Sequence, residues 1–428
     1  MATKPSNVTL NSNSIDILNT IRSVQSYDYQ DRVPIATQDN LRQVASSILS
    51  SFDLSNAFIN TLVNRIALVL INSKLFNNPL REFKRGTLEY GEFIEELFVN
   101  IAKAHQFDPA VAENEVFKRE IPDVSAYFHK MNYQNFYKVT ISNEQLRQAF
   151  LTQQGISDLI GRIVDSLYSG ANYDEFIIMK QMIAEAAQNG DFYSVTIPTP
   201  SAGTAKDIVT SFKSISNMIE FPSTMYNAAG VLNWVPKDRQ ILLISAELDA
   251  LIDVEVLASA FNMSKAEFMG RRVLVDNFGD AQNVYAAIVD SDWFMVFDNQ
   301  INFTENYNGQ GLYWNYFYHV WKTFSYSKFA PAILFTTSAN TVTGVTVSPD
   351  TATVARGNSL QLTASVATTG FAPQVVTWSV TGSEDVTSTI SSTGKLIVAA
   401  NEANTTLTVT ATSDFDPSKS GTSTITVS

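Results

Sequence analysis

The stretch at residues 311–321, GLYWNYFYHVW, constrains the fold more than any other part of the chain. A β-strand points alternate side chains to opposite faces. One face of a strand here would carry Trp314, Tyr316 and Tyr318, and the other would carry Phe317 and Trp321. Aromatic rings favour burial, while tyrosine hydroxyls and indole N–H groups need hydrogen-bond partners. The pattern fits an ordinary buried strand, or a sheet core that continues into a protein–protein interface.

A sharp change of composition divides the chain near residue 336. Before it the sequence is mixed, and after it Thr, Ser, Val and Ala dominate, with short alternating strands between Gly, Pro and Asp turns. Such spacing is typical of a β-sandwich. A length of 428 residues also fits two or three domains. We expect an α+β domain over residues 1–338, a linker at 339–344, and a sandwich over 345–428 with Trp378 in its core.

Within the first domain, apolar residues recur at helical spacing between residues 142 and 190. This predicts a spine of two helices, or of one long bent helix, because Gly170 interrupts the pattern. Residues 1–70 have scattered apolar positions and no core of their own, so we expect an arm that packs on something else. Residues 191–335 alternate short apolar runs with capped helical runs, which predicts mixed α/β structure.

Residues 74–98 carry charges of opposite sign on their two halves. The leading half is basic, with Lys74, Arg81, Lys84 and Arg85, and the returning half is acidic, with Glu89, Glu92, Glu95 and Glu96. Gly86 and Gly91 bracket a possible turn, which predicts an extended hairpin. A two-stranded hairpin alone is marginal in water. We therefore expect it to lie on a neighbouring subunit, with these charges at the contact; pairing across its own two strands is the alternative.

The sequence offers little for catalysis or for a metal. It has no cysteine and only three histidines, with no metalloprotease, nucleophile-elbow or phosphate-loop motif. Carboxylate pairs such as Asp290 and Asp292 are typical of solvated surface, although glycosidases also use two carboxylates. Asp414 and Asp416 are better explained by a turn of the sandwich than by calcium. We expect no enzyme, no cofactor and no metal site.

Charge and hydropathy bear on location and partners. The net charge of −13 disfavours sequence-specific binding of nucleic acid, which needs clustered Lys and Arg. The residues after Met1 are polar and do not form a signal peptide, and no apolar run reaches the length of a membrane span. We expect a chain that is made and folded in a cytoplasm, without a membrane partner.

Several long segments resemble the major capsid protein of small short-tailed bacteriophages of the phi-29 type. They are NNPLREFKRG at 77–86, IEE at 94–96, AFNM at 260–263, DWFMVFDN at 292–299 and the aromatic stretch at 311–321. The end of the chain resembles bacterial immunoglobulin-like domains of group 2, through VTVSP at 345–349, VTWSV at 376–380, GKL at 394–396 and TVTAT at 408–412.

The resemblance implies a Hong-Kong-97-type capsid fold, with an N-terminal arm, an extended hairpin loop, a spine helix, a peripheral domain and an axial domain. It implies a structural protein that self-assembles through hexamers and pentamers into an icosahedral or prolate phage head. Its partners would be a separate scaffolding protein, a portal protein and packaged double-stranded DNA bound without sequence specificity.

Assembly would take place in the host bacterial cytoplasm, and we expect it to be non-covalent because no cross-linking motif is evident. The immunoglobulin-like domain would face outward and could touch host cell-wall glycan. The alternatives are a surface adhesin with a wall-binding module and a glycan-degrading virion enzyme.

Overall fold

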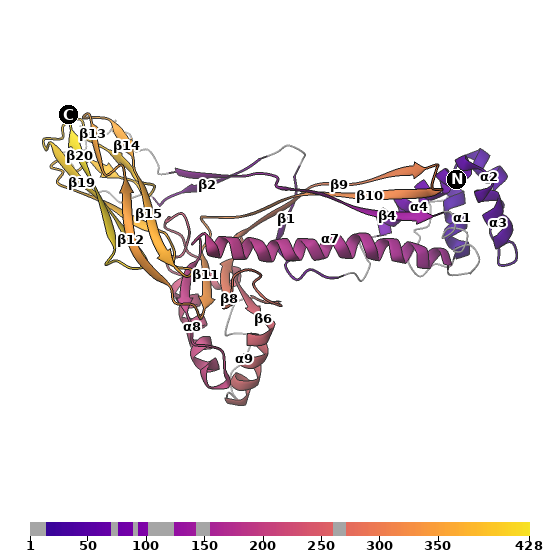
Figure 1. The fold of residues 1–428 in the computed structure, drawn as a ribbon, viewed down its shortest axis with the longest axis horizontal. Coiled ribbons are helices and arrows are strands. Elements are labelled where there is room, and N and C mark those ends of the chain that lie inside the picture. The colour runs from indigo at the N-terminus through magenta and orange to yellow at the C-terminus, as the bar shows by residue number, and fades with distance from the viewer. Residues whose placement is uncertain (1–13, 70–75, 89–92, 102–123, 143–154, 260–270) are drawn as a thin grey trace, which may run out of the picture.

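The structure is a computed structural model that describes residues 14–69, 76–88, 93–101, 124–142, 155–259 and 271–428. The described chain is elongated (Figure 1). A long helix runs beside long strands, a helical cluster covers one end of the sheet, and a β-sandwich lies at the other end. A smaller α/β unit projects to one side, so the architecture is α+β.

A long helix and a long sheet form the backbone of the molecule. Helix α7 (Gly155–Gln188) is continuous over 34 residues, roughly 50 Å at 1.5 Å per residue. The sheet has the order β1-β9-β10-β4, with β1 (Lys84–Thr87) parallel to β9 (Phe294–Asn308). Strand β10 (Tyr313–Tyr326) is antiparallel to both β9 and β4 (Tyr133–Ser142).

The spine is therefore one helix over the described residues from Gly155 to Gln188. The first part of the expected range, residues 143–154, lies outside the described residues. Gly170 does not end the helix. A Cβ atom at this glycine would lie 3.5 Å from the ring of Tyr137 on β4, so the glycine lets helix and strand approach closely.

The N-terminal residues form a cluster of helices that packs on the rest of the chain. Helices α1 (Ser14–Val24), α2 (Tyr27–Arg32), α3 (Leu41–Leu49) and α4 (Phe52–Val69) pack on the end of the long sheet and on α7. Their apolar side chains share one core with the buried side chains of β10, so the support that these residues need comes from the same chain.

The side unit is a five-stranded sheet with the order β5-β11-β8-β6-β7. Its strands are β5 (Tyr193–Thr196), β6 (Gln240–Ser245), β7 (Arg271–Val275), β8 (Val284–Asp290) and β11 (Ala332–Thr336). Helices α8 (Ala205–Met218) and α9 (Ala246–Ser259) flank it. Alternate side chains of β6 feed two separate cores, one shared with α7 and one shared with α8 and α9.

Short 3-10 turns at Arg81–Phe83 (η2), Ala202–Thr204 (η3) and Lys237–Arg239 (η4) connect these elements. A separate antiparallel hairpin is formed by β2 (Ile94–Val99) and β3 (Val124–His129). In Figure 1, β2 continues past the long sheet toward the end of the molecule that carries the sandwich.

The C-terminal region is a β-sandwich with its own apolar core. Its strands are β12 (Thr341–Ser348), β13 (Thr351–Val354), β14 (Ser359–Gln361), β15 (Thr363–Thr369), β16 (Val376–Thr381), β17 (Thr389–Ile390), β18 (Lys395–Ile397), β19 (Thr406–Ser413) and β20 (Ser420–Val427). The connection is shorter than the expected 339–344 linker, because β12 already begins at Thr341.

The sandwich is seated on the body through side-chain contacts. The Phe371 ring packs against the core beneath α7, and the ring of Phe415 meets that of Tyr193 edge-on with centroids 5.8 Å apart. The Asn340 side chain donates a hydrogen bond to Thr196 at 3.2 Å. These contacts fix the orientation of the sandwich relative to the rest of the described chain.

Candidate assembly interface

The aromatic strand β10 has one covered face and one open face. On the covered face, Trp314 and Tyr318 are each 5% exposed and Tyr316 is 1% exposed, beneath α7 and the N-terminal helices. The rings of Tyr168, Tyr318 and Phe303 stack there, with neighbouring centroids 4.7 Å apart. This face is a packed core, as the ordinary-strand interpretation requires.

The open face of the same strand is aromatic but only half-buried. Phe317 and Trp321 both have intermediate exposure. The neighbouring Phe136 of β4 is 57% exposed and meets the Phe317 ring edge-on at 5.7 Å. Lys138 lies 5.8 Å from the centre of the Phe317 ring. An exposed aromatic cluster on a sheet face indicates a contact with another molecule.

A buried group of four charges joins the long helix to the sheet. Glu175 of α7 is 2% exposed and accepts hydrogen bonds from Lys322 of β10 and, at 3.2 Å, from Lys84 of β1. Lys84 also contacts Asp298 of β9 at 2.7 Å. The Asn78 side chain donates a further hydrogen bond to Glu175 at 3.0 Å. Two lysines and two carboxylates thus compensate one another inside the protein.

The surroundings shift the pKa values of Glu175 and Lys84. Burial alone would raise the pKa of Glu175, but the ammonium groups of Lys322 and Lys84 outweigh it and hold this pKa below its ordinary value. For Lys84, burial acts to lower the pKa, and the two carboxylates raise it above the ordinary value. Both groups are therefore charged near neutral pH, and the cluster fixes α7 against the sheet.

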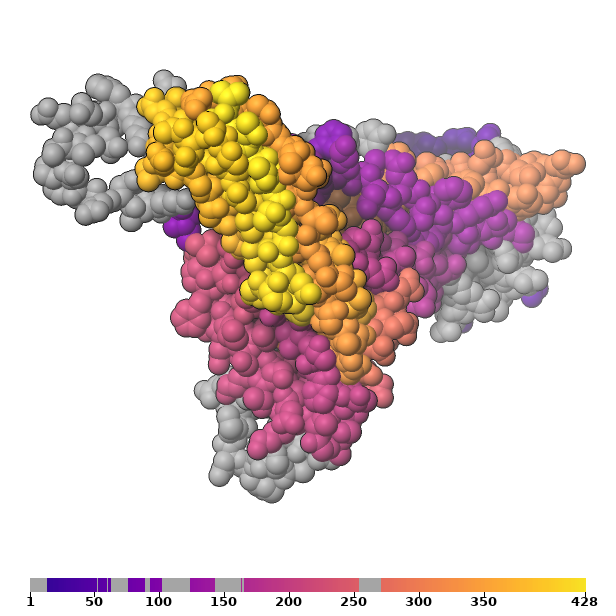
Figure 2. All heavy atoms as spheres, turned by 60° about the vertical axis from the view of Figure 1, so that its left-hand side comes forward, coloured from indigo at the N-terminus to yellow at the C-terminus, as the bar shows by residue number. Residues whose placement is uncertain are grey.

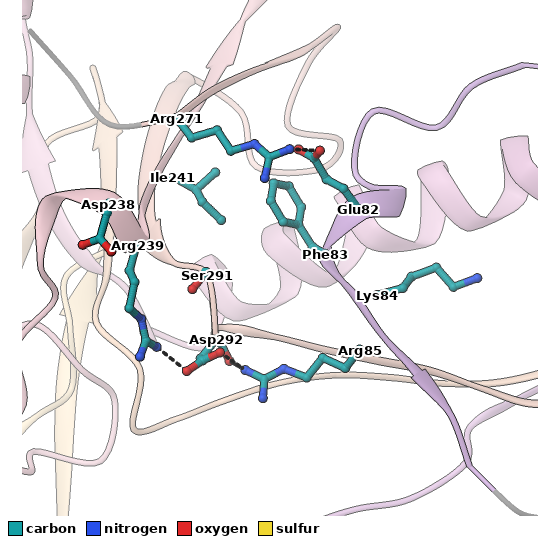
Figure 3. A pocket seen from close by; sticks show the side chains of 10 residues that line it. All are labelled: Glu82, Phe83, Lys84, Arg85, Asp238, Arg239, Ile241, Arg271, Ser291 and Asp292. Atoms are coloured by element: carbon teal, nitrogen blue, oxygen red, sulfur yellow. Dashed lines mark hydrogen bonds and ion pairs between the residues drawn. The ribbon is translucent and has the colours of Figure 1, made fainter. Parts of the chain in front are cut away.

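The next basic residue, Arg85, belongs to a ladder of charges on the surface. Its guanidinium lies 2.7 Å from a carboxylate oxygen of Asp292 and donates to the backbone carbonyl of Phe294. Arg239 pairs with the same Asp292 and, at 2.8 Å, with Asp290. Figure 3 shows Arg85, Asp292 and Arg239 along one side of an open pocket of about 400 Å³.

The opposite wall of the pocket carries the pair Arg271 and Glu82 (Figure 3). The ring of Phe83 and the side chain of Ile241 lie between the two walls. Four basic and three acidic side chains line the pocket, and each basic one is already paired with a carboxylate, so none is left free to select a phosphate. Its charges hold β1 against the side unit.

The residues singled out at 74–98 do not form one hairpin. Strand β1 pairs with β9, and β2 pairs with β3, so the basic and acidic halves are not paired with each other. The expected hairpin at 74–98 is wrong in this respect; the hairpin observed uses residues 94–99 and 124–129. Lys84 and Arg85 have partners within their own subunit, 91 and 207 positions away along the chain.

The remaining charged residues of that stretch have different surroundings. Arg81 and Glu95 are exposed, whereas Glu96 is half-buried and contacts His129 of β3 and Ser327. Lys74, Glu89 and Glu92 lie outside the described residues. Of the predicted inter-subunit charges that the structure describes, Arg81, Arg85 and Glu95 are exposed. Arg85 is already paired with Asp292, so Arg81 and Glu95 remain candidates for a contact with a neighbouring chain.

The hairpin β2–β3 has two unlike faces. On one face Phe98 stacks on Phe329 with centroids 5.3 Å apart, and Glu96 meets the segment that follows β10. The opposite face is open and mostly apolar: Leu97, Val99, Val124 and Phe128 lie on the paired strands and Phe93 and Ile101 lie beyond the ends of β2, all between 49% and 64% exposed. We call these six residues the apolar hairpin face. The exposed Glu95 lies on the same face, opposite Phe128.

In the sandwich, Trp378 is half-buried and packs against the apolar core from β16. Glu402 is 1% exposed and accepts hydrogen bonds from the hydroxyls of Ser383 and Ser388, both at 2.6 Å. These hydrogen bonds lower the pKa of Glu402 to about 2. The Glu402 carboxylate therefore joins three turns of the sandwich through hydrogen bonds.

Two buried charged residues, Glu175 and Lys322, were not predicted from the sequence. Glu175 occupies the same i, i+4 stripe of α7 as the buried Ala171 and Met179. Lys322 continues the alternation of buried residues in β10, two positions after the buried Val320. A charged residue in a buried register is the signal that could have identified both.

Neither a metal site nor a membrane span is found in the part of the chain that the structure describes. There, no three His, Cys, Asp or Glu side chains are grouped so as to hold a metal ion. None of the described helices is long and apolar enough to cross a membrane.

The fold defines the class of protein. The chain superposes on the capsid structure of Staphylococcus phage Andhra with a TM-score of 0.51 and 16% sequence identity, over 63% of this chain and 86% of that chain. This likeness shows the Hong-Kong-97-type fold of phage shell proteins, with an immunoglobulin-like β-sandwich added at the C-terminus.

Sequence comparison then gives the family. Residues 18–336 match the Phi29-like phage major capsid protein family, and residues 341–423 match the bacterial Ig-like domain (group 2). The major capsid protein of Bacillus phage PZA is 39% identical over 407 residues, which cover 94% of this chain and 90% of that protein. That of Bacillus phage GA-1 is 36% identical over 402 residues, covering 92% and 84%.

The chain therefore belongs to the Phi29-like phage major capsid protein family. It is a structural protein of the phage head, a component of the virion and a homo-oligomer, and it is not a member of an enzyme family. The expected fold class and function are confirmed, and the adhesin interpretation is not favoured.

Proposed function

We propose that this chain closes its shell chiefly by laying the apolar hairpin face on a neighbouring copy. The observation that carries the proposal is the row of six large apolar side chains, 49% to 64% exposed, on one face of a two-stranded hairpin. A hairpin of this kind is marginal in water, and large exposed apolar patches mark interaction sites. In a protein that assembles with itself, the simplest cover is a second copy.

The open aromatic face of β10 and β4, with Phe317, Trp321 and Phe136, is the second surface that we assign to contacts between copies. Its aromatic rings are of the residue types enriched at interface cores. Arg81 and Glu95 are proposed to add ion pairs with a neighbouring copy, Glu95 from within the apolar hairpin face, opposite Phe128. An exposed ion pair is worth only about 0–1 kcal/mol. Many copies of a weak contact suffice in a closed shell.

Membership of this family supports a proposal for the remaining partners. We propose that hexamers and pentamers build the head in the host bacterial cytoplasm with a separate scaffolding protein, and that a portal protein occupies one vertex. Packaged double-stranded DNA would be held without sequence specificity, since the net charge of −13 gives no basis for reading bases.

We also propose that the sandwich faces outward and can touch neutral host cell-wall glycan. Support comes from rows of hydroxyl side chains on its four-stranded sheet: Thr377, Ser379, Thr381, Thr406, Thr408, Thr410, Thr412, Ser420, Thr422, Thr424 and Thr426. The strands β19 and β20 form a continuous strip on the face turned to the viewer in Figure 2. Co-sedimentation of the virion with purified host cell wall, with and without the sandwich, tests this contact; equal binding would count against it.

The hairpin proposal is tested with the double variant Leu97→Asp, Phe128→Asp, expressed with the other head proteins of its phage. Two carboxylates on the apolar hairpin face should abolish shells, seen by negative-stain microscopy, while the subunit keeps its circular dichroism. The matched control is Val386→Asp, at a side chain of the sandwich that is 91% exposed. Normal shells from the double variant would overturn the proposal.

A further inference from the structure

The root of the hairpin is held by a compact polar cluster centred on one carboxylate. One oxygen of Glu96 accepts a hydrogen bond from the Ser327 hydroxyl at 2.5 Å, and the other lies 3.2 Å from Nε2 of His129. The second ring nitrogen of His129 lies 2.7 Å from the Ser325 hydroxyl. The cluster therefore ties β2 and β3 to the end of β10 and to the segment that follows it.

The surroundings leave these groups few other partners. His129 is 5% exposed and Ser327 is 2% exposed. The Ser327 oxygen also accepts backbone N–H groups of Phe329 and Ala330, at 3.2 and 3.1 Å, so its proton is directed at Glu96. Hydrogen bonds to a charged acceptor are about twice as strong as neutral ones.

Aromatic contacts on the same face extend the anchor. Phe98 and Tyr127 both meet the ring of Phe329, with centroids 5.3 and 5.2 Å away. Further along, the side chain of Asn100 accepts the backbone N–H of Leu232 at 3.4 Å. All of these contacts lie on the face of the hairpin opposite the apolar hairpin face. They decide in which direction the apolar hairpin face points.

We propose that Glu96 is a positioning residue that latches the hairpin at a fixed angle to its own subunit, and that this latch controls the curvature of the shell. The second part rests on the proposed function, because the angle matters only if the hairpin reaches a neighbouring copy. A flat sheet of subunits and a closed head differ by small rotations between neighbours. A hairpin held at one angle selects one rotation, whereas a loose hairpin permits several.

The latch is tested first in the unassembled full-length subunit, by hydrogen exchange of the amides at residues 94–99 and 124–129. Glu96→Ala should speed their exchange roughly tenfold or more, since hydrogen bonds to a charged group are lost. The midpoint of global thermal unfolding should move little. Glu95→Ala is the matched control, because it removes the same charge from the adjacent, exposed position. Exchange that is unchanged in Glu96→Ala, or equally faster in both variants, would overturn the latch.

Shell geometry is tested next, with the same variants expressed alongside the other head proteins. Glu96→Ala should give shells of mixed diameter or open sheets in electron micrographs, and Ser327→Ala should give a weaker version of the same defect. Uniform heads of normal diameter, despite faster exchange at the root, would overturn the control of curvature. The two proposals fail separately: Leu97→Asp, Phe128→Asp should leave exchange at residues 94–96 unchanged while abolishing assembly.

Discussion

The hairpin β2–β3 and the β-sandwich both extend from the body, yet they differ in whether their apolar side chains are covered by their own chain. The sandwich encloses its own core, and the exposed positions of its strands carry hydroxyl side chains. The hairpin encloses nothing, and six apolar side chains on its free face are about half exposed. A region that is complete within one chain can be added or removed during evolution, whereas a region completed by a neighbour is tied to assembly.

Removing the sandwich should therefore leave assembly intact. A chain that ends after Ala339 is expected to form shells in normal yield by electron microscopy, although loss of the Phe415 contact exposes the Tyr193 ring. The separate piece 340–428 should melt cooperatively because it keeps its core. If the truncated chain gives no shells, the sandwich is itself part of the assembly contact and the contrast with the hairpin fails.

The next effect concerns the core beneath the body's sheet. Trp314 is 5% exposed, so Trp314→Ala should lower the free energy of unfolding of the body by about 3–5 kcal/mol. Chemical denaturation followed by circular dichroism measures this loss. The sandwich should unfold as before, since its core is separate. A loss below about 1 kcal/mol would show that the indole is not packed as described.

The buried charges predict a dependence on pH as well as on mutation. Glu175→Ala leaves two lysines without their shared carboxylate and should cost about 3–5 kcal/mol. The pKa of Glu175 is lower in the folded chain, so its contribution is present above its unfolded pKa of roughly 4.3 and is lost as pH falls through the folded value. Denaturation between pH 6 and pH 3 should show a flatter profile for Glu175→Gln than for the unaltered chain. Parallel profiles would contradict this account of the cluster.

The smallest effect lies in the sandwich. Because hydroxyl hydrogen bonds from Ser383 and Ser388 lower the pKa of Glu402 to about 2, its contribution should persist until the pH falls well below 4. Glu402→Gln should speed hydrogen exchange at residues 383–404 in the full-length chain while leaving β10 unchanged. Unaltered exchange at these residues would show that the hydrogen bonds to Glu402 do not hold the turns together.

The elements with strong periodicity were predictable from sequence. The alternation in β10 and the helical stripe of α7 both depend on burial within one element, so local spacing reports them. The strands of the sandwich followed from regular turns, and Trp378 does pack against its core.

The partners of charged residues were not predictable in the same way. The run of basic residues at Lys84 and Arg85 suggested a contact between subunits, yet their carboxylates come from α7, β9 and the turn before β9. Charge in a sequence gives a sign but no partner. For the same reason, Lys84→Glu would disturb the subunit itself, because it would place a third carboxylate beside Glu175 and Asp298.

The most direct test of the central claim uses the absence of cysteine from the chain. Leu97→Cys on the apolar hairpin face and Val386→Cys on the sandwich each supply one thiol, whose reaction rate with a maleimide can be compared between unassembled subunits and closed heads. We expect the thiol at position 97 to react at least about tenfold more slowly in heads, because a neighbouring copy covers it. The thiol at position 386, where the native side chain is 91% exposed, should react equally in both states. Equal reaction rates at position 97 in subunits and in heads would contradict the claim that the hairpin is completed by a second copy.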